Sequence, residues 1–84
     1  MEIGKTYFFK TVTHHYLGTV VHVGITHVTL KDASEVYETG PLVDFYGSGK
    51  VKYCERVPDG WMVPLNGTCV GPWAHDLPKK AIGL

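Results

Sequence analysis

The sequence predicts a mainly β protein: a small, strongly bent antiparallel β-barrel of about five strands, with one short helix near residues 41–47. Three observations support this fold class. Segments rich in Val, Thr, Tyr and Phe recur along the chain, and glycines and prolines separate them at short intervals. Only one segment has apolar residues at helical spacing. A two-layer α+β fold is the alternative.

The length of the chain favours one domain. Its 84 residues, 44% of them hydrophobic, predict a single globular domain over residues 1–84, with a C-terminal tail from about residue 76. A domain of this size buries only about 60–65% of the surface that its unfolded chain exposes. Association would bury more, so we expect a homo-oligomer joined through strand edges.

The first strand is expected over residues 5–15, KTYFFKTVTHH, which are rich in Tyr, Phe, Thr and Val. Rough alternation puts Phe8 and Phe9 on opposite faces of this strand. Gly18 then marks a turn or a bulge, and a second strand is expected over residues 19–23.

A third strand is expected over residues 26–32, THVTLKD, after a break at Gly24. If Gly24 and Ile25 form a two-residue connection, His22 pairs with His27 directly across the hairpin. Two successive hairpins predict an antiparallel meander.

The middle of the chain changes character. Residues 33–40, ASEVYETG, are expected to extend the third strand before a turn at Gly40. The helix follows over residues 41–47, because Pro41 suits a first helical position. The apolar side chains that share its face are Leu42, Phe45 and Tyr46.

Short strands are expected in the rest of the chain. A fourth strand over residues 50–57, KVKYCERV, ends at the turn signal PDG of residues 58–60. The segments WMVPL and GTCVGPW predict one or two further strands, with Pro64 at an edge or a bulge.

The charges of the chain are balanced, with eight Lys and Arg against eight Asp and Glu, and Arg56 is the only arginine. Binding to long nucleic acid is therefore disfavoured, because it relies on clustered basic side chains. The N-terminus has no signal-peptide pattern and no apolar run spans a bilayer, so we expect a cytoplasmic protein without a membrane partner. Cys54 and Cys69 have no CxxC spacing and are interpreted as two free thiols, with one disulfide between them as the alternative.

Residues 18–33, GTVVHVGITHVTLKDA, resemble the glycine–apolar strand, short turn and apolar-x-apolar-x-Asp-Ala strand of Sm-like barrels. Similar patterns occur in SH3-like barrels, so the resemblance implies an Sm-like or SH3-like fold. Sm-like proteins form rings of subunits joined edge to edge, and many bind RNA through a loop with an Asp before the turn and an Asn after it. Gly24 and His27 occupy those places here, so RNA binding does not carry over. The order of segments is also similar to small uncharacterised proteins of bacteria and their phages.

Four of the five histidines lie within residues 14–27, which raises the question of a metal site. A stable zinc site needs three or four ligands. His14 and His15 are expected on opposite faces of one strand, so at most one of them can join His22 and His27. No catalytic motif is recognisable either. The sequence therefore predicts no metal, no cofactor, no catalytic residue and no enzymatic activity.

Aromatic and polar side chains near breaks are better functional candidates, because pockets form in irregular regions. The residues that we expect to bind a ligand are His14, His15, Tyr16, Tyr46, Trp73 and His75. In this interpretation the indole of Trp73 stacks on a base. The alternative is that Trp73 covers the open end of the barrel and anchors the tail.

These observations predict a non-enzymatic, homo-oligomeric binding module for a small polar or nucleotide-derived ligand. A phage protein that sequesters a nucleotide signal would have such features. Two alternatives remain: a structural or adaptor oligomer, for example a component of a phage particle, and RNA binding of the Sm type.

Overall fold

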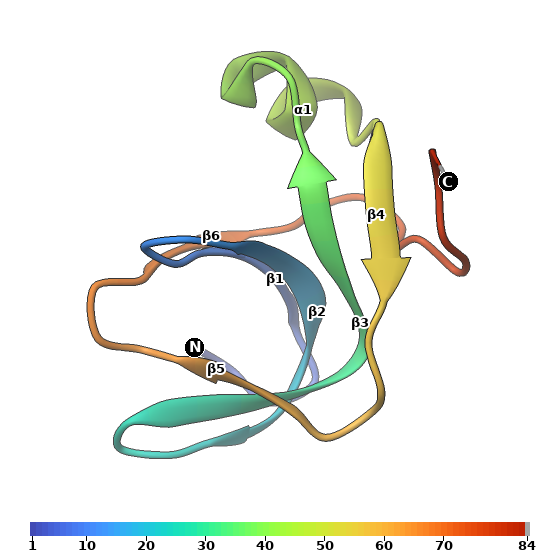
Figure 1. Cartoon of the computed structure of the whole chain (residues 1–84). Coiled ribbons are helices and arrows are strands. Elements are labelled where there is room, and N and C mark those ends of the chain that lie inside the picture. Colours follow the sequence, from blue (N-terminus) through green and yellow to red (C-terminus); the bar gives the residue numbers. More distant parts are fainter. Residues whose placement is uncertain (84) are drawn as a thin grey trace.

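The computed structural model describes residues 1–83, which form a mainly β structure with one short helix (Figure 1). In chain order the elements are β1 (Thr6–Lys10), β2 (His15–Val23), β3 (His27–Glu38), α1 (Leu42–Ser48), β4 (Tyr53–Arg56), β5 (Trp61–Pro64) and β6 (Cys69–Pro72). All strand pairs are antiparallel, and the strand order is β4-β3-β2-β1-β6, with β5 also paired to β3. The predicted mainly β class is confirmed. The domain expected over residues 1–84 includes Leu84, which lies outside the described residues.

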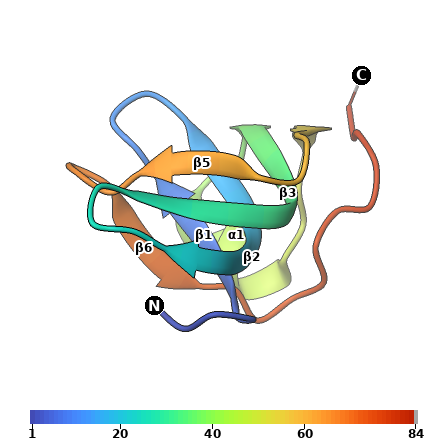
Figure 2. The same cartoon turned by 90° about the horizontal axis from the view of Figure 1, so that it is seen from below.

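The strand β3 bends the sheet. Its first half, residues 27–30, pairs with β5, and its second half, residues 34–38, pairs with β4. Between the two halves, Asp32 has a positive φ of 50°, which is uncommon for a residue other than glycine, and its N–H donates to Asp59 Oδ1 at 2.9 Å. Figure 2 shows β5 beside the first half of β3. The bend lets one edge of β3 serve two different strands.

The bent sheet does not close into a barrel. β6 pairs with β1 and β5 pairs with β3, so these two consecutive strands lie at different edges. Within the described residues, no ladder of hydrogen bonds joins β5 to β6. The structure therefore shows a strongly bent antiparallel sheet of six strands and leaves the predicted barrel unconfirmed.

The first hairpin differs from the prediction of one strand over residues 5–15. β1 ends at Lys10, and the Thr11 N–H donates to the His14 carbonyl at 2.8 Å to close a turn. The Thr11 hydroxyl also accepts the His14 N–H at 2.9 Å, a local bond that competes with an extended strand. Gly18 lies inside β2, at a shift in register between Leu17 and Thr19, so it marks a bulge.

The predicted pairing of His22 with His27 is wrong. The Gly24 N–H donates to the His27 carbonyl at 2.8 Å, so the turn lies one residue later than expected, and His22 pairs with Thr29. A second register shift lies beyond this pair, between Val20 and His22. It places buried Val20 opposite buried Leu30, whereas the predicted register would place Val20 opposite Thr29.

The later elements follow the expected order with adjusted ends. β3 continues to Glu38, which confirms the predicted extension of the third strand. The helix α1 covers 42–48 rather than 41–47, because Pro41 takes the N-cap position, and Gly49 ends the helix with a φ of 71°. β4 is shorter than the expected strand over residues 50–57.

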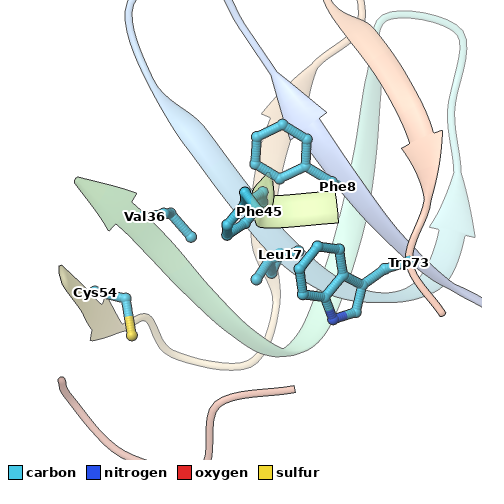
Figure 3. Close-up of a cluster of buried hydrophobic side chains, with 6 residues drawn as sticks. All are labelled: Phe8, Leu17, Val36, Phe45, Cys54 and Trp73. Carbon is cyan, nitrogen blue, oxygen red and sulfur yellow. The ribbon is translucent and has the colours of Figure 1, made fainter. Parts of the chain in front are cut away.

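Two hydrophobic clusters lie on opposite faces of the sheet. The helix-side cluster, drawn in Figure 3, consists of Phe8, Leu17, Val36, Phe45, Cys54 and Trp73. The strand cluster consists of Phe9, Val20, Val28, Leu30, Ala33 and Val63. Because the neighbouring residues Phe8 and Phe9 are both buried, β1 is covered on its two faces.

The C-terminal tail lies along the outer side of β4 (Figure 1). The N–H groups of Cys54 and Ile82 each donate to the other's carbonyl at 3.0 Å, so the tail occupies part of the β4 edge. Cys54 is buried and Cys69 is exposed, and both are free thiols. Among the described residues, no helix has the length and apolar character needed to cross a bilayer.

Candidate functional site

Five of the six residues expected to bind a ligand fall into two groups. Tyr46, Trp73 and His75 lie together: the ring centroids of Tyr46 and Trp73 are 5.8 Å apart, and those of Trp73 and His75 are 5.1 Å apart. His14 and Tyr16 form the second group, in which their rings stack with centroids 6.3 Å apart. The fold therefore does not gather all six around one ligand.

Trp73 belongs to the core. Its side chain is only 6% exposed, and its ring packs against Phe45 with centroids 4.8 Å apart. The indole N–H donates to the Asp76 carbonyl at 3.3 Å, while His75 Nε2–H donates to the Tyr46 carbonyl at 2.7 Å. These contacts tie the segment after β6 to α1 and leave little of the indole exposed for stacking.

His15, the sixth residue, lies on the same side of the sheet as the helix-side cluster, because it is two residues from Leu17 in β2. Its ring centroid is 5.4 Å from that of Phe8. Burial lowers the pKa of His15, and the positive charges of Lys10 and His14 lower it further. The structure thus favours a neutral imidazole at this position.

The histidines do not converge on a metal. His22 lies opposite Thr29, and His14 contacts Glu35, with His14 Nε2 and Glu35 Oε1 3.5 Å apart. Within residues 1–83, no group of three or more His, Cys, Asp or Glu side chains has the arrangement of a metal site.

An open cleft of about 520 Å³ lies between the bend of β3, the end of β4 and the start of the tail. It is lined by Thr6, Asp32, Arg56, His75, Asp76, Leu77, Pro78 and Lys79. His75 is the one expected ligand-binding residue in this lining. Volumes of about 300–1,000 Å³ are typical of sites for small molecules.

Arg56 is held in place at this cleft. Its Nε–H donates to the Ala33 carbonyl at 3.1 Å, and an Nη1–H donates to the Lys79 carbonyl at 3.0 Å. A guanidinium has five N–H donors, and these two bonds use only two of them within residues 1–83. Among the described residues, no carboxylate lies within 4.0 Å of Arg56. The cleft therefore has a fixed cation with unused donors.

The charged groups that line the cleft balance one another. Arg56 and Lys79 are cationic, while Asp32 and Asp76 are anionic. The Thr6 hydroxyl shares a hydrogen bond of 3.3 Å with the Thr19 hydroxyl. A ligand in this cleft would therefore meet both donors and acceptors.

Sequence reasoning missed most of this lining. Arg56 stands out as the only arginine, but a single arginine in a strand is usually a solvated surface residue. Asp32 and Lys79 are separated by more than half of the chain, and the bend of β3 and the path of the tail bring them to one cleft. No spacing in the sequence indicates that proximity.

Three comparisons with known proteins were made for this chain. No protein-family model matches it, and no curated protein or solved structure matches it either.

Proposed function

We propose that this chain is a non-enzymatic binding domain that holds a small polar ligand, with nucleotide-derived molecules as the first class to test, in the cleft beside Arg56. The proposal rests on Arg56: its side chain lines the open cleft and is held by two backbone carbonyls, and its guanidinium has further donors that these two bonds do not use. A fixed guanidinium loses little side-chain entropy on binding an anion, which favours affinity.

The lining suggests the chemistry of the ligand. The planar guanidinium of Arg56 matches two oxygens of a phosphate or a carboxylate. Asp32 and Asp76 repel a purely anionic ligand, and they accept hydrogen bonds from amino or hydroxyl groups. A small molecule with an anionic group at one end and donors at the other, such as a nucleotide, satisfies both requirements.

We further propose that the bent sheet is a variant of the Sm-like or SH3-like barrel, and that copies of the chain associate through the outer edges of β5 or β6. Within the described residues, β5 pairs only with β3 and β6 only with β1, so each has one edge without a partner strand. Ile82, by contrast, covers part of the β4 edge. Sedimentation of the purified chain over a range of concentrations tests this association.

A thermal-shift screen with nucleotides and cyclic nucleotides tests the ligand proposal. A ligand at a hundred times its Kd stabilises the folded state by about 2.7 kcal/mol, so we expect a rise of several degrees in Tm. Arg56→Gln should abolish the rise. Lys31→Gln is the matched control, because it removes one positive charge at an exposed site outside the cleft lining. An unchanged Tm across the panel, or an equal rise in Arg56→Gln, would overturn the proposal.

A further inference from the structure

The second half of β3, with β2 and β4, has one face that stays partly exposed in the part of the chain that the structure describes. Tyr16, Glu35 and Glu55 are aligned across β2, β3 and β4, so their side chains share this face. Tyr37, two residues beyond Glu35, lies on the same face and is 48% exposed. We call this surface the open face; it consists of His14, Tyr16, Glu35, Tyr37, Tyr53 and Glu55. The opposite face of the same strands packs in the helix-side cluster.

Two carboxylates lie directly opposite each other at its centre. Glu35 and Glu55 are cross-strand neighbours, and like charges in such positions destabilise a sheet. The Tyr37 hydroxyl lies 2.8 Å from Glu35 Oε2 and 2.9 Å from Glu55 Oε2. A hydroxyl has a single proton, so it satisfies one carboxylate at a time. The pair therefore retains acceptor capacity and unneutralised negative charge.

Little positive charge near this pair offsets it. The His14 imidazole lies 3.5 Å from Glu35 and is the one basic side chain, among the described residues, in ion-pair range of either glutamate. The hydrogen bond to Glu35, followed in size by the one to Glu55, raises the pKa of Tyr37. Its hydroxyl therefore keeps its proton and adds no further negative charge.

Aromatic rings flank the carboxylates on both sides. The rings of Tyr37 and Tyr53 meet edge to face, with centroids 5.2 Å apart. On the other side, Tyr16 lies between His14 and Trp61, and the centroids of Tyr16 and Trp61 are 6.5 Å apart. Exposed aromatic faces attract cations and cover the aliphatic stem of a lysine or an arginine.

We propose that the open face is a docking surface for a basic segment of a partner protein, with one Lys or Arg side chain paired to Glu35 and Glu55 beside the Tyr37 hydroxyl. Charge complementarity selects this occupant, because a cationic group neutralises the two carboxylates, whereas an acidic partner repels them and a purely apolar partner buries their charge. The surface is separate from the Arg56 cleft: Glu55 and Arg56 are adjacent in β4, and adjacent side chains in a strand point to opposite faces. The proposal therefore does not depend on the ligand of the cleft.

Nuclear magnetic resonance of the full chain, titrated with an oligolysine peptide, tests this inference. The chain has no net charge, so general attraction to the peptide is weak. We expect saturable binding, with shift changes confined to amides near Glu35, Tyr37 and Glu55, and none with an oligoglutamate peptide. Glu55→Gln should weaken binding about threefold to tenfold.

Asp44→Asn is the matched control, because it removes one negative charge from α1, which lies on the other side of the sheet. It should change the affinity less than about twofold. Glu35→Gln provides a second variant, and a dispersed spectrum verifies folding in each case. Absent binding, shift changes spread over the whole surface, or an equal loss in Asp44→Asn would refute the proposal. A dimer without peptide that Glu55→Gln dissociates would also refute it, since the occupant would then be a second copy.

Discussion

The strand cluster and the helix-side cluster lie on opposite faces of the same sheet, yet they are assembled in different ways. The strand cluster is aliphatic except for Phe9, and its residues come from β1, β2, β3 and β5 alone. The helix-side cluster also needs α1 and the segment after β6, which contribute Phe45 and Trp73. One cluster thus follows from the bending of strands, and the other from the docking of distant segments onto them.

This difference indicates which part of the molecule can open without unfolding of the whole domain. Contacts in the strand cluster are backed by ladders of hydrogen bonds on both sides of β3. In the helix-side cluster, α1 presents Phe45 as its buried residue, and this ring packs against Phe8 and Trp73 with centroids 5.2 and 4.8 Å away. We therefore expect the strand cluster to unfold with the whole domain and the helix side to open separately.

Truncating one large side chain in each cluster should have the largest effect. Phe9→Ala and Phe45→Ala each leave a cavity, which lowers the free energy of unfolding by about 3–5 kcal/mol. In Phe45→Ala, residues 42–48 should also exchange their amide hydrogens faster, because α1 loses its buried side chain. Urea denaturation and hydrogen exchange measure the two effects. Equal exchange of residues 42–48 in both variants would contradict the separate opening of α1.

Adding a methyl group at Gly18 or Gly71 compares how much stability each cluster loses when an extra atom must be accommodated. A Cβ at Gly18 would lie 2.9 Å from Ala33 Cβ and 3.1 Å from Leu30 Cδ1, so Gly18→Ala should lower stability by about 1–3 kcal/mol. A Cβ at Gly71 would instead meet the hydroxyl end of the Tyr46 side chain, which we expect to shift more easily than the strand residue Ala33. Gly71→Ala should therefore be the milder change in urea denaturation. A greater loss in Gly71→Ala would show that Tyr46 is rigid.

Removing the Ser34 hydroxyl should stabilise the protein. Ser34 is fully buried and, within the described residues, its Oγ has no hydrogen-bond partner. Burying a hydroxyl without a partner costs free energy, and Ser34→Ala removes that cost. We expect a gain of about 1 kcal/mol in the free energy of unfolding. Ser48→Ala is the control, since the Ser48 hydroxyl is exposed and donates to the Asp44 carbonyl at 2.8 Å. A loss of stability in Ser34→Ala would show that the hydroxyl is satisfied in solution.

The smallest effect concerns His15, at the rim of the helix-side cluster. Its folded pKa lies below the ordinary value of 6.5, chiefly through burial. As the pH falls, the unfolded chain therefore binds a proton at His15 before the folded chain does. The contribution of His15 to the free energy of unfolding is complete above pH 6.5 and is lost as the pH falls below it. In His15→Gln, the urea midpoint should fall less between neutral and mildly acidic pH than in the wild type. Identical pH profiles would exclude this role.

Local patterns predicted much of the fold and little of the candidate site. Alternating β-formers and the apolar spacing around Phe45 indicate strands and a helix, because these patterns reflect neighbours along the chain. The turn after Lys10 escaped prediction because Thr11 has high β-propensity, yet its hydroxyl bonds to the turn backbone. Of the residues expected to bind a ligand, only His75 lines the cleft, since Arg56 and Asp32 reach it through the bend of β3.

By itself, the sequence determined the mainly β class, the short helix and the placement of Phe8 and Phe9 on opposite faces of one strand. Tertiary structure alone decided the register of the second hairpin, the two clusters and the cleft beside Arg56. The physical reason is that alternation specifies which side chains share a face, whereas the bulges at Gly18 and near Val21 and the bend at Asp32 depend on packing against strands elsewhere in the chain. The same dependence places Glu35 opposite Glu55 on the open face.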